Sequence, residues 1–334
     1  RSVLLHPDVD MAVFETARGG ILRAGLGFDR CDVAVVTNIG IGDHLGMNYI
    51  NTVEELATVK RVIVENVKPG GMAVLNAQDP HVAGMAASCP GEVTFFARDP
   101  RHPVIETHRA RGGRVAFVDQ GDMVFAQDRM ETRVQLSTVP LTHQGTIAFQ
   151  VENALAATAA AWAMGVDWVQ IQRALATFVN DAGTVPGRFN LFDYRGATVI
   201  ADYGHNPDAM QALVQAVQAM PAKRRTVVIS GAGDRRDQDI RRQTEILGDV
   251  FDSVVLYQDQ CQRGRADGEV LALLREGLHA ARRTRQMDEI HGELLAIDTA
   301  LDALEPGDLC LVLIDQVELA LAHIENRLRT PMPA

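Results

Sequence analysis

Acidic and imidazole side chains recur at the ends of the strands that this sequence predicts. Glu15 ends one apolar run, and His44 lies in the glycine-bearing loop that follows another, within Thr37–Leu45 (TNIGIGDHL). The carboxyl ends of parallel strands meet at one edge of a sheet, where α/β proteins bind their ligands. A carboxylate and an imidazole there would give Mg²⁺ two protein ligands and leave positions for water and phosphate oxygens. The alternative for His44 is a capped turn with a hydrogen-bonded imidazole, because short motifs often arise by chance.

Lys60 lies on an apolar helix face and needs a chemical explanation. A helix is expected from about residue 52 to 67, and its spacing places Lys60 on the same face as Leu56, Ile63 and Val67. A buried ammonium group is costly unless it is paired or chemically modified. The alternative is a lysine whose stem packs on the apolar face while its ammonium group reaches water.

A second group of polar residues follows strands in the later half of the chain. Asp202 and His205 end a strand in the segment DYGHNP, where Pro207 suits the first turn of a helix whose N-terminus would attract phosphate. The segment 231–237 (GAGDRRD) follows the next strand, and its glycines would let backbone amides approach an anion. Arg188 could bind phosphate through two parallel hydrogen bonds. The alternatives are helix caps, a bare turn and a linker salt bridge, respectively.

Two asparagines are candidates for contacts to a nucleotide base. Asn76 ends a strand in the segment LNAQDP, and Asn153 stands near the start of an alanine-rich helix. An amide side chain carries both a donor and an acceptor, so it can recognise the edge of an adenine ring. The alternative is helix capping, by Asp79 beside Asn76 and by the Glu152–Asn153 pair.

Strands and helices alternate along most of the chain, which predicts parallel sheets with crossover helices. The expected strands are residues 11–16, 32–38, 72–76, 198–202, 226–230, 253–257 and 309–314. Helices are expected at 52–67, from 79, and at 152–165, 166–178 and 207–219. Between them, residues 100–139 contain Gly112-Gly113 and Gly121-Asp122, which favour hairpins at a sheet edge. Residues 181–188 (DAGTVPGR) indicate a linker.

The composition excludes several classes of protein. The chain has 334 residues, 32 Lys and Arg against 43 Asp and Glu, and a net charge of −11, the opposite of the usual nucleic-acid binder. Its length suggests two domains of about 150 residues. The longest apolar stretch, 154–166, is too short to cross a bilayer, and four separated cysteines fit a reducing cytosol. The sequence lacks G-x-G-x-x-G and G-x-S-x-G motifs, which disfavours a dinucleotide oxidoreductase and a serine hydrolase.

Taken together and in order, these segments resemble the Mur ligase family. The resemblance rests on Glu15, Lys60 and the segments TNIGIGDHL, LNAQDP, ENALAA, PGRFN, DYGHNP and GAGDRRD, which span nearly the whole chain. Four longer segments are similar to the cyanophycin synthetase branch of this family: ETARGGILR (15–23), ENALAATAAAWAMG (152–165), GDRRDQDI (233–240) and RGRADGE (263–269).

The resemblance implies an α/β protein with two domains. Residues 1–183 would form a Mur ligase-like central, ATP-binding domain with a mostly parallel sheet, helices and a β-hairpin region at the edge. Residues 187–330 would form a Rossmann-like C-terminal domain. The implied activity is an ATP-dependent amide ligation. It would join the α-amine of arginine to the β-carboxyl of polyaspartate, the growing cyanophycin chain, through an acyl phosphate.

The resemblance also assigns roles to individual residues. Metal positions fall on Glu15, His44 and Lys60, the last carried as a carbamate in many Mur ligases. The adenine would lie near Asn76 and Asn153, and the ribose and phosphates near Arg188, Asp202 and His205. The implied catalytic residues are Lys60, Arg188 and His205, and the implied cofactors are ATP and Mg²⁺. Polyaspartate would need local positive charge, for which the candidates are Arg18, Arg23, Arg235, Arg236, Arg263 and Arg265.

Some features depart from the family pattern. Gly46 follows Leu45 where many Mur ligases have an aspartate, and the chain opens on Arg1. A phosphate loop and an ATP-grasp module are expected upstream in the same enzyme, so these residues alone are expected to be inactive. The resemblance further implies a cytoplasmic homo-oligomer without a nucleic-acid or membrane partner. The alternatives are another Mur-like peptide or folate ligase, or a truncated, non-catalytic nucleotide-binding module.

Overall fold

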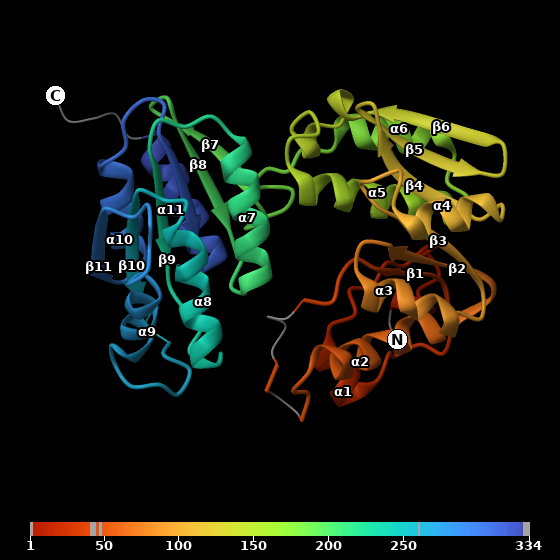
Figure 1. Ribbon diagram of the computed structural model, residues 1–334, viewed down its shortest axis with the longest axis horizontal. Coiled ribbons are helices and arrows are strands. Elements are labelled where there is room, and N and C mark those ends of the chain that lie inside the picture. Colours follow the sequence, from red (N-terminus) through yellow and green to blue (C-terminus); the bar gives the residue numbers. More distant parts are fainter. Residues whose placement is uncertain (1–2, 41–44, 47–48, 260, 330–334) are drawn as a thin grey trace. The chain divides into compact units, whose positions relative to one another are not determined.

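The computed structural model describes residues 3–40, 45–46, 49–259 and 261–329 (Figure 1). The chain divides into two compact units, residues 1–178 and 179–334, and each is considered by itself. All four cysteines are free thiols. Within the described ranges, every helix is too short or too polar to cross a membrane.

Unit 1 is built on a six-stranded sheet with the order β1-β2-β3-β4-β5-β6. The first four strands pair in parallel: β1 (Cys31–Val36), β2 (Val67–Asn76), β3 (Glu92–Phe96) and β4 (Arg114–Asp119). Two antiparallel strands complete it: β5 (Asp122–Gln127) and β6 (Met130–Gln135). The helices are α1 (Arg18–Ala24), α2 (Val53–Glu65), α3 (Pro80–Gly84), α4 (Pro103–Ala110), α5 (Ala148–Ala163) and α6 (Trp168–Thr177). The expectation of a mostly parallel sheet with hairpins at its edge is confirmed.

Helices cover both faces of this sheet because the side chains of each strand alternate between them. Ala73 and Leu75 of β2 pack in one apolar core with residues of α2, α3 and α4. Met72 and Val74 of the same strand pack in a second core with residues of α5 and with Trp168 of α6. Burial on both faces explains why the parallel strands read as continuous apolar runs rather than as alternating ones.

A close backbone contact joins the start of β3 to β2. A Cβ on Gly91 would lie 2.3 Å from the carbonyl oxygen of Gly71, and a Cβ on Gly71 would lie 2.6 Å from the carbonyl oxygen of Asp32. Both obstacles are backbone atoms, so no side chain can move aside. Glycine at these two positions therefore lets the three neighbouring strands approach at their amino ends.

The expected strand at residues 11–16 is wrong. In the structure this run has no regular secondary structure and pairs with no strand of the described chain. Val13 is 92% exposed and Phe14 is 45% exposed. A strand is stabilised by hydrogen bonds to a neighbouring strand, and an apolar run without such a neighbour has no ladder to join.

The expected hairpin region, residues 100–139, is confirmed only in part. Gly121 turns the chain between β4 and β5 with φ +87°. The turn between β5 and β6 instead uses Asp128, at φ +52°, since aspartate tolerates the left-handed region better than most residues. Gly112-Gly113 follows α4, a helix that the sequence pattern did not predict.

Unit 2 contains a second six-stranded sheet with the order β11-β10-β9-β12-β8-β7. Its strands are β7 (Asn190–Tyr194), β8 (Ala197–Asp202), β9 (Arg225–Ile229), β10 (Ser253–Gln258), β11 (Gln286–His291) and β12 (Leu309–Leu313). Only the β7–β8 pairing in this sheet is antiparallel. The helices are α7 (Pro207–Ala219), α8 (Asp237–Gly248), α9 (Glu269–Gly277), α10 (Glu293–Asp302) and α11 (Val317–Arg329). This alternation of strands and helices confirms the expected Rossmann-like unit.

One face of the second sheet packs against α10 and α11. Val199 and Ala201 of β8 share an apolar core with Ala296 of α10 and Leu321 of α11. The helices α7, α8 and α9 contact one another in series, and α9 also contacts β10 (Figure 1). Because β8, β9, β10 and β12 pair in parallel, their carboxyl ends lie at one edge of the sheet. This is the edge where α/β proteins bind their ligands.

Candidate functional site

The carboxyl ends of β2 and β3 carry a connected set of polar side chains. Asn76, at the end of β2, is 5% exposed, and its Oδ1 accepts a hydrogen bond from the Gln78 amide (2.9 Å). Gln78 Oε1 accepts from the amide of Arg98, which follows β3 (3.0 Å), and Arg98 Nε donates to Glu152 of α5 (2.8 Å). The two strand ends and α5 therefore meet at one polar edge of unit 1.

Asn153 belongs to the same helix but does not cap it. The helix α5 begins at Ala148 with Ile147 as its N-cap, so the expected start at Glu152 is one turn late. Asn153 Nδ2 donates to Oε1 of Gln150 (3.1 Å), a side chain that is 5% exposed. This bond fixes the orientation of the Asn153 amide, and it does not involve its oxygen.

Asp79 joins two loops at this edge. Its Oδ1 accepts from the amides of His81 (2.9 Å) and Val82 (3.2 Å), so it is the N-cap of α3, as the capping alternative expects. Its Oδ2 accepts from the amide of Ile39 (2.7 Å), in the loop after β1. One carboxylate thus holds the loop after β1 to the loop after β2.

The three expected metal ligands are placed unequally. Glu15 is exposed in the irregular segment before α1. Lys60 is half-buried on α2, whose buried residues are Leu56 and Val64. His44 lies outside the described residues. Among the residues that the structure does describe, no three His, Cys, Asp or Glu side chains gather closely enough to hold a metal ion. The described donors therefore do not by themselves complete a Mg²⁺ site.

Unit 2 brings Arg188, Asp202 and His205 together. The amide of Phe189 donates to Asp202 Oδ2 (2.8 Å), and the Arg188 guanidinium carbon lies 6.0 Å from the ring centre of Tyr203. The rings of Tyr203 and His205 meet edge to face, with 4.5 Å between their centres. The next residue, Asn206, caps α7 and accepts from the amide of Ala209 (2.8 Å), which is the capping alternative at that position.

Burial sets the protonation of both titratable groups in this set. Burial raises the pKa of Asp202 to about 6, although the hydrogen bond from the Phe189 amide and the charge of Arg188 favour the carboxylate. Burial also lowers the pKa of His205 to about 4, and the positive charges of Arg263 and Arg235 lower it further. Near neutral pH the two groups are therefore a carboxylate and a neutral imidazole.

The neutral imidazole of His205 has a nitrogen without a hydrogen-bond partner in the described chain. Its side chain is 9% exposed, and Nε2 lies 3.8 Å from Asp315 Oδ1, which is too long for a hydrogen bond. Buried polar atoms are nearly always bonded in folded proteins. Nε2 is therefore poised to bond a ligand at the carboxyl edge of this sheet.

Several arginines suggested for polymer contacts bind the protein's own groups. Arg236 makes two hydrogen bonds to Asp239 (2.8 and 3.0 Å), and Arg18 is only 7% exposed. Arg263 and Arg265 are each paired with two carboxylates. In this structure the guanidinium groups of Arg236, Arg263 and Arg265 therefore pair with carboxylates of the protein itself.

Sequence reasoning missed Arg98 and Asp315 as members of these polar edges. Arg98 follows the carboxyl end of β3, and Asp315 follows that of β12. The rule that identified Asn76 and Asp202, a polar residue just after a parallel strand, would also have identified these two.

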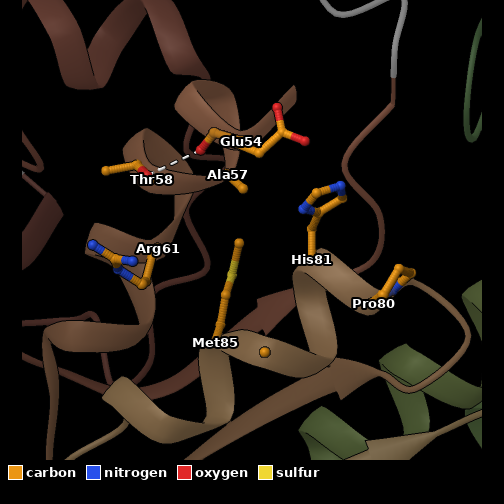
Figure 2. A pocket seen from close by; sticks show the side chains of 8 residues that line it. Glu54, Ala57, Thr58, Arg61, Pro80, His81 and Met85 are labelled. Carbon is orange, nitrogen blue, oxygen red and sulfur yellow. Dashed lines mark hydrogen bonds between the residues drawn. The ribbon is translucent and has the colours of Figure 1, made fainter. Parts of the chain in front are cut away.

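A separate groove lies between α2 and α3 and contains none of the predicted residues. Its volume is about 310 Å³, and its lining is Glu54, Ala57, Thr58, Arg61, Pro80, His81, Gly84 and Met85. Figure 2 shows the Glu54 carboxylate and the His81 imidazole on the same side of the groove, with Met85 reaching toward Ala57. It is open to solvent and distinct from the polar edge at Asn76.

Two family descriptions match this chain. The Mur ligase middle domain matches residues 2–161, and the Mur ligase glutamate ligase domain matches residues 187–313. The solved structures agree in fold: FolC of E. coli in complex with DHPP and ADP has a TM-score of 0.62 at 21% identity and covers 88% of this chain and 61% of its own. MurF from Acinetobacter baumannii has a TM-score of 0.61 at 19% identity, covering 88% and 60%. The chain belongs to the Mur ligase family.

Within that family, the chain is similar to cyanophycin synthetases. It is 40% identical to that of Synechocystis sp. over 326 residues, and 39% identical to that of Crocosphaera subtropica. Each alignment covers 97% of this chain and 37% of the relative. The chain thus spans little more than a third of the length of these relatives, and the resemblance drawn from its motifs is confirmed.

Proposed function

We propose that this chain is the part of a cyanophycin synthetase that joins the α-amine of arginine to the β-carboxyl of polyaspartate. The observation that carries the proposal is the identity of 40% to such an enzyme across 97% of the chain. The polar edges of the two sheets support it, because each places donors and acceptors where α/β proteins bind nucleotides and substrates.

We propose the following division of roles. The adenine lies at the edge formed by Asn76 and Asn153, and the ribose and phosphates lie against Arg188, Asp202 and His205. Glu15, His44 and a carbamylated Lys60 would hold Mg²⁺, which supplies positive charge to the β- and γ-phosphates when bound. Residues 1–183 and 187–330 are the two proposed domains.

The reaction brings anions together, so its barrier is largely electrostatic. The substrate carboxylate attacks the γ-phosphorus and displaces ADP, which gives an acyl phosphate. The amine then attacks the acyl carbon, loses a proton and releases phosphate, which leaves the amide. Arg188 would stabilise charge on the transferred phosphoryl group. His205, neutral near pH 7 because burial lowers its pKa to about 4, would lie beside the phosphate without adding charge.

Removing the Asn153 amide is expected to weaken nucleotide binding. In Asn153→Ala the affinity for ADP should fall about 10-fold, or about 1.4 kcal/mol, because one hydrogen bond to the base edge is lost. Calorimetric titration of the 334-residue chain with ADP measures this. Asn66→Ala is the matched control, since that amide bonds the Val62 carbonyl at the end of α2 (2.7 Å). Equal affinities for Asn153→Ala and the unsubstituted chain would remove Asn153 from the base site.

The 334 residues alone are expected not to ligate. With ATP, Mg²⁺, arginine and polyaspartate, phosphate release should stay at the background rate. It should rise when a phosphate loop and an ATP-grasp module from the full length of a relative are supplied in the same polypeptide. The assay follows phosphate release and arginine incorporation together. Turnover by the 334 residues alone would show that they already contain a complete site.

A further inference from the structure

The segment RGRADGE, Arg263–Glu269, has no role in the chemistry proposed so far. It connects β10 to α9 and lies against the loop that follows β9, residues 230–236. A Cβ on Gly233 would lie 2.2 Å from the carbonyl oxygen of Gln262, so the two backbones touch at that point. The two loops therefore form one packed structure at the carboxyl edge of the unit 2 sheet.

Arg265 donates hydrogen bonds to the backbone of this loop on both sides of Asp234. Its Nε donates to the carbonyl oxygen of Gly233 (2.7 Å), and its Nη2 donates to the carbonyl oxygen of Arg235 (2.7 Å). A guanidinium group is a rigid planar fork, so two of its donors can hold two fixed acceptors at once. Because the two carbonyl groups flank Asp234, these two hydrogen bonds fix the direction in which the Asp234 side chain points.

Two carboxylates hold Arg265 itself in place. Its Nη2 pairs with Asp237 (2.8 Å), the first residue of α8, and its Nη1 donates to Glu269 (2.6 Å), the first residue of α9. The Arg265 side chain is 15% exposed. A largely buried guanidinium with four fixed partners is a structural anchor rather than a mobile surface charge.

Arg263 extends this network of polar contacts toward His205. Its Nη1 lies 3.4 Å from Asp234 Oδ1, and its Nη2 lies 3.3 Å from Asp315 Oδ1. The same Asp315 oxygen lies 3.8 Å from His205 Nε2. The Arg263–Glu269 segment is therefore linked through Asp234 and Asp315 to the imidazole at the proposed phosphate site.

Buried polar atoms without hydrogen-bond partners in the described chain gather around these loops. They are Nε2 of His205, Oγ of Ser230, Oε1 of Gln243 and Oε1 of Gln262. Ser230 and Gln243 are 4% and 0% exposed, and Gln243 Nε2 donates to the carbonyl oxygen of His205 (3.0 Å). A buried polar atom without a hydrogen-bond partner destabilises the folded state. Atoms of this kind at one sheet edge indicate a site for a polar ligand.

We propose that Arg265 is a positioning residue that shapes the 230–236 loop and so sets the affinity of unit 2 for its amine substrate. This inference rests on the proposed function. The nucleotide is assigned to other residues. Charges of both signs lie at this loop: Asp234 belongs to it, and Arg263 pairs with both Asp234 and Asp315. Free arginine carries both a carboxylate and a guanidinium, so its chemistry matches such a site.

The test compares Arg265→Gln and Arg265→Lys in the full 334-residue chain with a matched control, Arg275→Gln. Arg275 makes two hydrogen bonds to Glu289 (2.6 and 3.1 Å) in the same unit, away from the loop. Amide hydrogen exchange of residues 232–236 and calorimetric affinities for L-arginine and ADP are measured for each.

Arg265→Gln should speed exchange in the loop and weaken L-arginine binding, each at least 10-fold, with less than a 2-fold change for ADP. Arg265→Lys should give nearly the same loop exchange and L-arginine affinity as Arg265→Gln, because an ammonium group does not reproduce the planar guanidinium. Arg275→Gln should match the unsubstituted chain in all three measurements.

The outcomes separate this inference from the proposed function. Unchanged amide exchange of the loop in Arg265→Gln would show that the Arg265 hydrogen bonds do not hold the loop. Faster exchange with unchanged L-arginine affinity would overturn the positioning role. An unsubstituted chain that binds ADP but not L-arginine would overturn the proposed substrate. The exchange comparison would still show whether Arg265 holds the loop in place. If Arg265→Gln does not fold, Gly233→Ala displaces the same loop from Gln262 with the guanidinium retained. It should also weaken L-arginine binding at least 10-fold, and unchanged affinity would count against the proposal.

Discussion

Replacing Gly91 by alanine is expected to destabilise unit 1 by more than about 3 kcal/mol, at the upper end of what overpacking costs. The new Cβ would lie 2.3 Å from the Gly71 carbonyl oxygen and 3.0 Å from that of Lys68. Because these are backbone atoms, β2 and β3 must separate at their amino ends to make room. Hydrogen bonds between the two strands and the cores on both faces of the sheet would then be disturbed.

Tryptophan fluorescence measures this effect in unit 1 alone. The chain has two tryptophans, Trp162 and Trp168, and both pack in unit 1 with Phe125 of β5. Urea unfolding followed by their emission should show the lower midpoint for Gly91→Ala. The matched control is Gly84→Ala, at the end of α3, where a Cβ meets nothing within 4 Å and alanine favours the helix. A midpoint for Gly91→Ala equal to that of the control would contradict the close strand contact.

Replacing Asp202 by asparagine is expected to stabilise unit 2 at pH 8 by up to about 3 kcal/mol, with little effect at pH 4. Burial raises the pKa of Asp202 to about 6, so the folded state favours the protonated acid. That contribution to stability is fully present below the ordinary pKa of 3.8 and is lost as the pH rises through about 6. Asparagine stays neutral at both pH values, and its oxygen can still accept from the Phe189 amide.

The measurement is the difference in unfolding free energy between Asp202→Asn and the unsubstituted chain at each pH. Urea unfolding is followed by circular dichroism, and tryptophan emission identifies the unit 1 transition separately. Taking the difference matters because His205 acts in the opposite sense: its pKa is lowered to about 4, so its contribution is present above pH 6.5 and lost as the pH falls. A difference that stays constant from pH 4 to pH 8 would show that the Asp202 carboxyl is not shielded from water.

Much of the fold follows from local sequence signals. The α7 helix has the bounds expected from Pro207 to Ala219, because Pro207 and the Asn206 cap define its start. The capping box of Thr52 and Glu55 likewise starts α2. The apolar run at residues 11–16 has the composition of a buried strand but no partner strand in the described chain, and pairing is not encoded locally.

The candidate site was predictable where a residue type coincides with the end of a strand. Asn76 and Asp202 end β2 and β8, so the carboxyl-edge rule identifies them. The hydrogen bonds from Arg265 to Gly233 and Arg235 could not be predicted. They join residues about 30 positions apart through backbone carbonyl oxygens. Backbone acceptors are common to all residues and leave no mark in the sequence.

The carboxylate of Asp79 has a consequence for ligand capture. It holds the amide of Ile39 and the start of α3 at once, so the segment that leads toward His44 and the loop beside Asn76 share one anchor. A ligand that orders one loop lowers the conformational entropy that the other must still lose. Cooperativity of this kind is reciprocal. If the proposed function holds, nucleotide and cation should each tighten the binding of the other by the same factor, whichever binds first.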